Sequence, residues 1–389
     1  MATRDEPVNS LADLEQAISA LLDVRPYSVP PLERHAALLM LFKKELNYAC
    51  ARSPKFKNYV RHWPSFPSVS CIANLPYLPV TVLKADSPLS LARAGDITRT
   101  LTSSATTSQR PSRVVLDAAT SRRLTRGVTA IMRDFIGPAR RPYLVIDTPE
   151  NLRRRPEMGA RGAAIQGLVP FASKIVCCLR RDSDGVASVD LETLRSLADK
   201  WRESEVLVFG FTHVIWNNFV LPLRRKGITL NLPNVHVLHS GGWKRLEQQA
   251  VSKDVFASGV SSVFGCKVKR VIDFYGMVEN LGVVYPDCEQ GNKHVPAFAE
   301  VIIRDPLTLA PVSPGETGLL QVCNVLPTSF PGFLLLTEDM AQLVGADGCL
   351  CGRRGTYFRY RHRVPKAEVR GCGNVDTPRQ FENRTVCLT

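Results

Sequence analysis

Long apolar runs are missing from this sequence. No stretch approaches the roughly 18 apolar residues that a membrane helix needs, and Met1–Glu6 lead into no apolar segment of the kind that signal peptides carry. No internal repeat or low-complexity tract is present, and a hydrophobic fraction of 44% argues against disorder. We therefore expect a globular chain with no membrane span and no export signal.

The sequence also has little that indicates nucleic-acid binding or a disulfide framework. Its 50 basic and 36 acidic residues give a net charge of +14, but the basic residues are scattered and accompany no nucleic-acid motif. We interpret this charge as a solvated basic face and expect no nucleic-acid partner. Eleven cysteines without an export signal are typical of reduced thiols in the cytoplasm, some of which could serve chemistry or a metal.

Hydrophobic periodicity predicts a helical N-terminal region followed by an α/β core. Residues 9–50 have the spacing of two helices, and a further helix is predicted over 112–135, directly after a hydroxyl-rich loop. Apolar runs typical of buried strands then alternate with helices, over 142–147, 174–179, 191–201 (helix), 205–210, 216–226 (helix) and 235–239. This alternation indicates parallel strands, and shorter strands and turns follow beyond about residue 297.

Four short motifs follow one another in this core. In chain order they are Thr102-Ser103-Ser104-Ala105-Thr106-Thr107-Ser108, His239-Ser240-Gly241-Gly242-Trp243-Lys244, Phe274-Tyr275-Gly276-Met277-Val278-Glu279 and Thr337-Glu338-Asp339. A hydroxyl-rich loop can hold phosphates, and a Gly-Gly turn lets a flat nucleotide approach the backbone. A Tyr can stack on a base while a nearby Glu reaches Mg²⁺, and a late Asp can bind ribose hydroxyls. Each motif alone is weak: the hydroxyl-rich loop by itself favours a solvated turn, and the Tyr-Gly segment could be a buried strand end.

In this order and at these separations, the motifs resemble the adenylate-forming enzymes, which activate a carboxylate with ATP as an acyl-AMP. Tyr275-Gly276-Met277-Val278-Glu279 is similar to one branch of them, the bioluminescence (LuxE-type) fatty-acyl-protein synthetases, which are related to phenylacetate-CoA ligases. Further stretches carry that narrower resemblance, over 328–332, 335–339, 351–358 and 367–373. The resemblance covers roughly residues 75 to 375.

The resemblance implies an α/β, adenylate-forming (ANL-like) domain over 1–362, with a helical region over 1–75, and a minimal C-terminal extension over 363–389. It implies an ATP and Mg²⁺ site made of Ser103, Ser104, Thr106, Thr107, Gly241, Gly242, Tyr275, Gly276, Glu279, Asp339 and Arg363. Lys244 is expected to contact the substrate carboxylate or a phosphate; the alternative is a surface lysine at a helix start. Ala105 and Ser108 stand where the family usually has glycines, which leaves open a non-catalytic scaffold.

Cys372 matches the family's acyl-accepting cysteine. It lies between two glycines, and Arg370 favours its thiolate, the reactive form. The resemblance implies that a carboxylic acid, in the family a fatty acid, is adenylated and then captured by Cys372 as a thioester. That thioester would be handed to a partner such as a reductase or a carrier protein. The alternative is an adenylate-forming ligase that passes the acyl group to CoA, a carrier thiol or an amine.

Two pairs of closely spaced ligand residues predict a metal site. Cys288 and His294 are separated by five residues, and Cys349 and Cys351 by one. Together they could close a tetrahedral Cys₃His site for structural Zn²⁺. The alternative is four unrelated residues, because a Cys-x-Cys pair is less specific than Cys-x₂-Cys.

Overall fold

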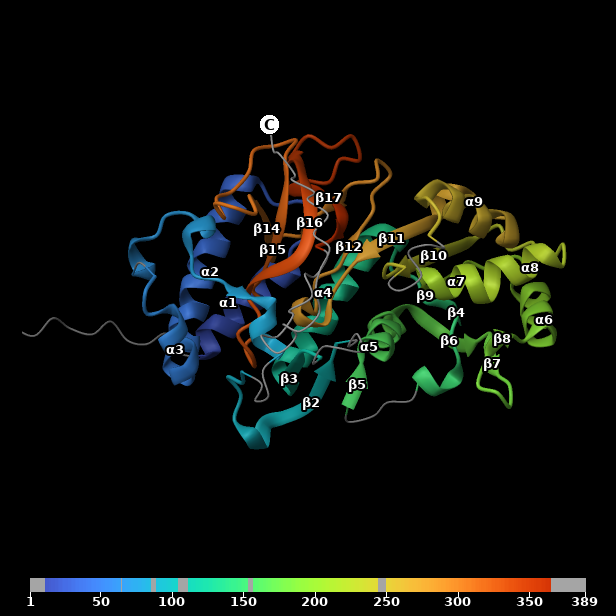
Figure 1. Ribbon diagram of the computed structural model, residues 1–389, viewed down its shortest axis with the longest axis horizontal. Coiled ribbons are helices and arrows are strands. Elements are labelled where there is room, and N and C mark those ends of the chain that lie inside the picture. The colour runs from blue at the N-terminus through green and yellow to red at the C-terminus, as the bar shows by residue number, and fades with distance from the viewer. Residues whose placement is uncertain are drawn as a thin grey trace, which may run out of the picture.

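The computed structural model describes residues 11–63, 65–84, 89–103, 111–152, 157–243 and 250–364 (Figure 1). At one side of the molecule lie three helices, α1 (Leu11–Asp23), α2 (Pro31–Arg52) and α3 (Pro54–Val60). The two helices predicted over 9–50 are thus confirmed, and Pro31 occupies the first turn of α2, where its missing N–H is not needed. Among the described residues no helix is both long and apolar enough to cross a membrane.

A six-stranded sheet forms the other side of the molecule. Its order is β12-β11-β10-β9-β4-β6, and every strand but β12 runs parallel to its neighbours. The bounds are β4 (Arg141–Val145), β6 (Ala172–Cys177), β9 (Val206–Phe211), β10 (Val235–Ser240), β11 (Val271–Tyr275) and β12 (Tyr285–Pro286). The parallel arrangement predicted from the four apolar runs is confirmed.

Helices cover both faces of this sheet. One face packs against α4 (Ala118–Ile136) and α5 (Ala160–Gly167) through an apolar cluster that includes Met132, Ile165 and Phe209. The other packs against α6 (Leu191–Trp201), α8 (Leu221–Arg225) and α9 (Lys253–Phe264). Between these lie α7 (Thr212–Ile215) and a π-helical turn over Trp216–Val220, so the helix predicted over 216–226 begins earlier and is irregular before Pro222.

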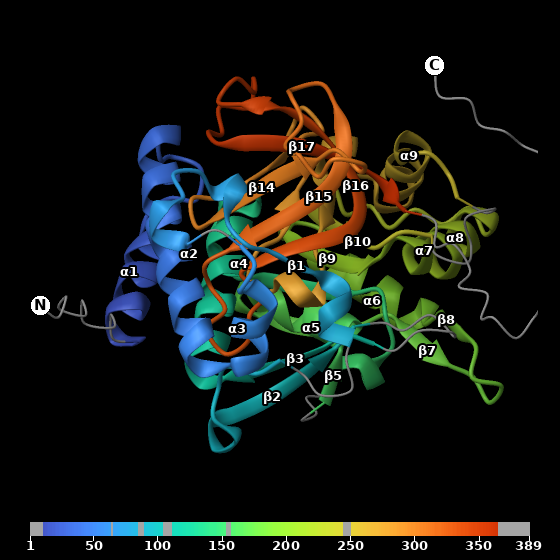
Figure 2. The ribbon, with the colours of Figure 1, turned by 60° about the vertical axis from the view of Figure 1, so that its left-hand side comes forward.

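A second six-stranded sheet stands between the N-terminal helices and the first sheet (Figures 1 and 2). It is mostly antiparallel, in the order β13-β17-β16-β15-β14, with β1 (Leu78–Pro79) added beside β16. The other bounds are β13 (Lys293–His294), β14 (Ala299–Arg304), β15 (Thr317–Asn324), β16 (Leu334–Ala346) and β17 (Thr356–Arg363). One large apolar cluster joins this sheet to α1, α2 and α4.

The helix predicted over 112–135 is partly wrong. Its first residues form β3 (Arg113–Asp117), which pairs with β2 (Ile97–Thr102) in a small sheet completed by β5 (Glu157–Gly159). Val114 and Val115 favour a strand, and the helix α4 begins only after Asp117, whose carboxylate accepts from the Thr120 amide. The first regular element after the hydroxyl-rich motif is therefore the strand β3 and not a helix.

Candidate functional site

The Gly-Gly turn directly follows β10 at the carboxyl edge of the parallel sheet. Gly241 has a φ of +82°, and a Cβ there would lie 2.8 Å from the Phe211 ring, so both backbone angle and space require glycine. A Cβ at Gly242 would meet no atom of the described residues within 4 Å. Relative to the described residues, the turn therefore presents backbone without side chains, as a nucleotide-binding turn needs.

Tyr275, at the end of β11, joins the two large sheets. Its hydroxyl donates to Oδ2 of Asp339 on β16 over 2.8 Å, and its ring stacks on Tyr360 of β17, with centroids 5.4 Å apart. Arg363 is the register partner of Asp339, and its Nε lies 3.9 Å from Oδ1 of that carboxylate. The structure thus brings together three of the residues predicted to hold ATP: Tyr275, Asp339 and Arg363.

Burial dominates the electrostatics of this junction. It raises the pKa of Asp339, against the opposing effects of the Tyr275 hydroxyl and the Arg363 guanidinium. Burial and the Asp339 charge likewise raise the pKa of Tyr275 well above its usual value. Because Tyr360 covers one face of the Tyr275 ring, a base that stacks on Tyr275 must use the other face or displace Tyr360.

Two further predicted residues follow Tyr275 on the same loop. A Cβ at Gly276 would lie 3.3 Å from a methyl of Val284, a tight contact that favours glycine. Glu279 belongs to a short 3₁₀ turn over Val278–Asn280 and is buried, with 6% of its surface exposed.

Of the residues predicted to hold phosphates in the hydroxyl-rich loop, Ser103 lies within the described ranges. Ser103 closes the neck of the β2–β3 hairpin: its amide donates to the carbonyl of Ser112 over 3.0 Å, and its hydroxyl accepts from the Ser112 amide over 2.8 Å. This hydroxyl already has a structural role. Other predicted site residues lie outside the described ranges: Ser104, Thr106, Thr107, Lys244, Arg370 and Cys372.

An apolar pocket of about 120 Å³ lies between α4, α5 and the ends of β9, β10 and β11. Ser240, Gly276 and Phe211 line it near the strand ends, and Met132 and Leu168 line it deeper. A larger hollow of about 450 Å³ lies near Arg140, which immediately precedes β4. That hollow is at the amino edge of the parallel strands, whereas ligands of such sheets bind at the carboxyl edge, so the smaller pocket is the candidate for substrate.

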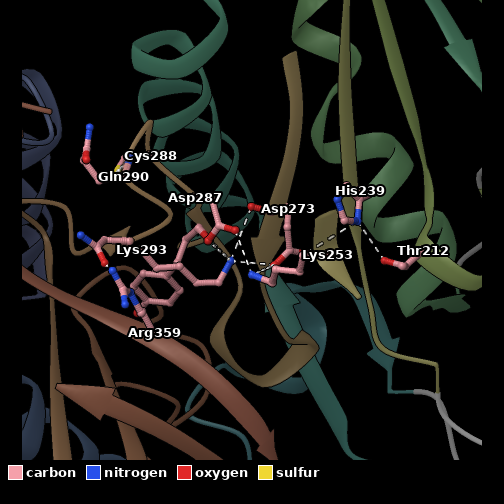
Figure 3. A network of polar contacts seen from close by, with 11 residues as sticks. Thr212, His239, Lys253, Asp273, Asp287, Cys288, Gln290, Lys293 and Arg359 are labelled. Atoms are coloured by element: carbon pink, nitrogen blue, oxygen red, sulfur yellow. Dashed lines mark hydrogen bonds and ion pairs between the residues drawn. The ribbon is translucent and has the colours of Figure 1, made fainter. Parts of the chain in front are cut away.

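On the other face of the same edge, the structure reveals a polar cluster that the sequence did not predict (Figure 3). His239 of β10 is the register partner of Asp273 of β11, and its Nδ1 lies 3.0 Å from the Thr212 hydroxyl and 3.8 Å from Oδ1 of Asp273. The imidazole packs on Phe256 at 4.4 Å. Burial lowers the pKa of His239 to about 4, so the ring is neutral at physiological pH.

Two lysines extend this cluster. Nζ of Lys293, 1% exposed, lies 3.0 Å from Oδ2 of Asp273 and 2.9 Å from Oδ1 of Asp287. Lys253, 64% exposed, bridges the same two carboxylates from the solvent side at 3.3 and 3.0 Å (Figure 3). The only sequence signal was the position of Asp273, two residues before the Tyr-Gly pair, because a lysine such as Lys293 is usually exposed.

The four predicted metal ligands converge. One ligand atom from each lies within 4.8 Å of all the others, in the set Cys288, His294, Cys349 and Cys351. Nε2 of His294 lies 3.2 Å from Sγ of Cys351, and Sγ of Cys288 lies 3.8 Å from Sγ of Cys349. The segments that carry them meet because β13 pairs with β17 just after the Cys349–Cys351 turn.

The surroundings of these thiols suit thiolate ligands. The Gln290 amide donates to Sγ of Cys288 and the Asn292 side chain to Sγ of Cys349, each over 3.4 Å. Although burial opposes it, hydrogen bonds that include those from the Cys351 backbone and Asn292 lower the pKa of the Cys349 thiol. Three sulfur donors and one imidazole are the ligand set of structural zinc, so the residues present fit that ion.

Known proteins with similar sequences are acyl-protein synthetases and fatty-acid ligases. A family model described as "Acyl-protein synthetase, LuxE" matches residues 18–379. The long-chain-fatty-acid–luciferin-component ligase of Aliivibrio fischeri is 32% identical over 107 residues, which are 27% of this chain and 28% of that protein. Its counterpart in Vibrio harveyi is 27% identical over 152 residues, 39% of each chain. These alignments thus span well under half the length of either relative.

Solved structures of 2-hydroxyisobutyryl-CoA ligase share the fold. An open form in complex with 2-HIB-AMP and CoA has a TM-score of 0.65 and 17% sequence identity, covering 88% of this chain and 78% of that one. A form in the thioesterification state has a TM-score of 0.66 and 17% identity, covering 88% and 72%. The mixed α/β fold predicted from the motif series is confirmed as that of adenylate-forming ligases.

Proposed function

The chain belongs to the LuxE acyl-protein synthetase family, and we propose that it activates a carboxylic acid with ATP and Mg²⁺ and then captures the acyl group on Cys372. One observation carries the proposal. The Tyr275–Asp339–Arg363 junction lies between the two sheets at the carboxyl edge, beside an apolar pocket and a bare Gly-Gly turn. A polar nucleotide site next to an apolar acyl site is what the first half-reaction requires.

The chemistry has two balanced steps. A carboxylate oxygen of the substrate attacks the α-phosphorus of ATP, the bond to the β-phosphate oxygen breaks, and pyrophosphate leaves with Mg²⁺. The Cys372 thiol then loses its proton to solvent, and the thiolate attacks the acyl carbon of the acyl-AMP. The carbon–oxygen bond to the phosphate breaks, and AMP leaves the thioester behind. Arg370, two residues from Cys372, favours the thiolate.

The proposed nucleotide site uses the predicted residues in distinct ways. Asp339 accepts one hydrogen bond from the Tyr275 hydroxyl, so its remaining lone pairs are available for ribose hydroxyls. Gly241 and Gly242 let the base approach the backbone, and Glu279 supplies a carboxylate for Mg²⁺. We assign the phosphates to the loop and its neighbours: Ser103, Ser104, Thr106, Thr107 and Lys244.

The acyl group is proposed to be a fatty acyl chain that a partner removes. The two relatives named above are ligases of long-chain fatty acids, and the pocket is lined mainly by apolar side chains. We place an adenylate-forming domain over 1–362 and the acyl-accepting extension over 363–389. A reductase or carrier protein would take the thioester, in the reducing cytoplasm, where the free cysteines of the described residues would remain reduced.

Zinc at Cys288, His294, Cys349 and Cys351 is proposed as structural. When bound, it supplies a crosslink between the β12–β13 connection and the turn before β17. The cluster contains four protein ligands, so it leaves no open coordination position for substrate.

Acid-dependent pyrophosphate release tests this function. Straight-chain acids from butanoate to hexadecanoate are supplied with ATP and Mg²⁺, and pyrophosphate is measured for the wild type, Arg363→Gln and Arg361→Gln. Arg361 is the matched control, because it lies on the same strand but donates to Gln342 on the neighbouring strand. We expect release with at least one acid, a raised KM for ATP in Arg363→Gln, and little change in Arg361→Gln. Release by none of the acids would exclude adenylation.

A further inference from the structure

The parallel sheet has one point where its strand order reverses. From β4 the chain passes to β6 on one side, and β9 then pairs with β4 on the other side. In open α/β sheets, ligands bind outside the carboxyl ends of the strands at such a reversal. The residues that follow β4 and end β9 are therefore the place to look for substrate contacts. They include Asp147 and Phe211.

Arg161, in the first turn of α5, lies at this point. Its Nε donates to Oδ2 of Asp147 over 2.6 Å, and its guanidinium lies 5.9 Å from the centre of the Phe211 ring. Oδ1 of Asp147 accepts from the Thr148 amide over 2.7 Å and from the Asn151 side chain over 2.9 Å. Asp147, 3% exposed, is thus held from both sides and fixes the orientation of Arg161.

The guanidinium retains binding capacity. Its side chain is 38% exposed, and Nε provides its hydrogen bond within the described part of the chain. The two terminal NH₂ groups stand at the far end of the guanidinium from the side-chain stem and can bind a second carboxylate end-on. Arginine is the residue best suited to this planar recognition.

The guanidinium lies near Phe211, a residue that lines the apolar pocket. Phe211 lines the pocket, and so do Ala163, Ala164 and Gly167 on the following turns of α5. Small side chains on this face leave room along the helix, and a Cβ at Gly167 would make only an ordinary contact of 3.8 Å with Val128. A molecule with an anionic head and an apolar chain would therefore place its head at the start of α5 and its chain along the helix.

The geometry points to Arg161 as the group that binds the substrate carboxylate at the mouth of the pocket, with Asp147 as its positioning residue. This inference rests on the proposed function and specifies the orientation of the acid in it. The other basic side chains described at this edge already pair with carboxylates of the protein. Lys253 and Lys293 each contact two carboxylates, and Arg363 pairs with Glu338 over 2.9 Å.

The test compares an acid with its neutral analogue in the absence of ATP. Octanoate and 1-octanol are titrated calorimetrically into the wild type, Arg161→Gln and Arg180→Gln. Arg180 is the matched control, because its Nε also donates to an aspartate, Asp190. Arg180 lies on β7 (Leu179–Arg181), which pairs with β8 (Ala187–Val189), and it does not line the pocket. We expect Arg161→Gln to weaken the affinity for octanoate about tenfold or more and to leave the affinity for 1-octanol unchanged. Arg180→Gln should change neither affinity.

A double variant separates binding from folding. Arg161→Gln leaves the buried Asp147 carboxylate without its cation, so the single variant is expected to lower the melting temperature. Adding Asp147→Asn should restore the melting temperature but not the octanoate affinity. The inference would be overturned if the wild type bound no octanoate, or bound it no better than 1-octanol. It would also be overturned if Arg161→Gln lost affinity for both ligands equally. Because ATP is absent, Arg161-dependent binding of octanoate would survive even if no acid released pyrophosphate.

Discussion

Lys293→Met tests how the buried charges near the candidate site are balanced. In the wild type, Nζ of Lys293 contacts both Asp273 and Asp287, and its exposed fraction is 1%. Methionine fills much of the same volume but removes the positive charge. Among the described lysines, Asp273 and Asp287 would then retain only Lys253 as a partner, on the solvent side.

The size of the stability loss follows from the unpaired charge that the substitution leaves. Removing one partner of a buried ion pair typically costs about 3–5 kcal/mol. Lys253 still neutralises part of the acidic charge, so we expect a loss of about 3 kcal/mol in the free energy of unfolding. Lys253→Met is the matched control, because this lysine contacts the same carboxylates but is 64% exposed. An exposed pair contributes about 0–1 kcal/mol, so the control should lose less than about 1 kcal/mol.

The loss should depend on pH. Although burial opposes it, the Lys293 ammonium holds the pKa of Asp273 well below its usual range. A carboxyl whose pKa is lower in the folded state stabilises the protein above its unfolded pKa of about 4, and this contribution disappears as pH falls through the folded value. The difference in unfolding free energy between the wild type and Lys293→Met should therefore be largest near pH 7 and should shrink below about pH 4.

Urea unfolding followed by tryptophan fluorescence, at pH 7 and at a pH well below 4, measures both effects. Elemental analysis of each variant checks the metal content, because Lys293 precedes His294. Adding Asp287→Asn to Lys293→Met should recover part of the lost stability. The explanation would be refuted if Lys293→Met and Lys253→Met lost equal stability, or if the Lys293→Met loss did not change with pH.

Three further predictions concern the metal, the nucleotide site and the core. We expect about one zinc per chain by elemental analysis, with metal lost and the melting temperature lowered in Cys351→Ser; protein purified without chelator and free of metal would contradict this. Glu279→Gln should weaken Mg²⁺-dependent turnover, and Asp339→Ala should weaken ATP binding by about 1.5–3 kcal/mol in calorimetry, whereas unchanged values in both would exclude the assigned site. Gly259→Ala should cost about 1–3 kcal/mol of unfolding free energy, because its Cβ would lie 2.6 Å from the Trp216 ring; a stabilised variant would refute this packing.

Much of the fold followed from local pattern. The apolar runs at 142–147 and 205–210 were long enough to be strands buried on both faces, and the helix over 191–201 has the predicted bounds because Asp190 caps it. The strand over 113–117 was missed because its short apolar run continues into the periodicity of α4. Only its pairing with β2 distinguishes it from a helix, and that pairing is not visible in the local sequence.

The site was predictable where short motifs carry it and hidden where distant segments meet. Paired spacing identified the Cys₃His cluster, which β13 and β17 then bring together. By contrast, no local pattern shows that Lys293 is buried against Asp273, or that Arg161 reaches Asp147 at the strand reversal. Both contacts depend on strand order and on the path of a helix across the sheet, which residue spacing does not encode.

In the function we propose, this chain adenylates an acid and accepts the acyl group itself. Intact-protein mass spectrometry after incubation with ATP, Mg²⁺ and the preferred acid tests it most directly. The wild type should gain the mass of the acid less one water, as an adduct that hydroxylamine removes and that peptide mass maps to Cys372, while Cys372→Ser should release pyrophosphate without gaining mass. Pyrophosphate release by the wild type with no adduct, or an adduct that persists in Cys372→Ser, would contradict it.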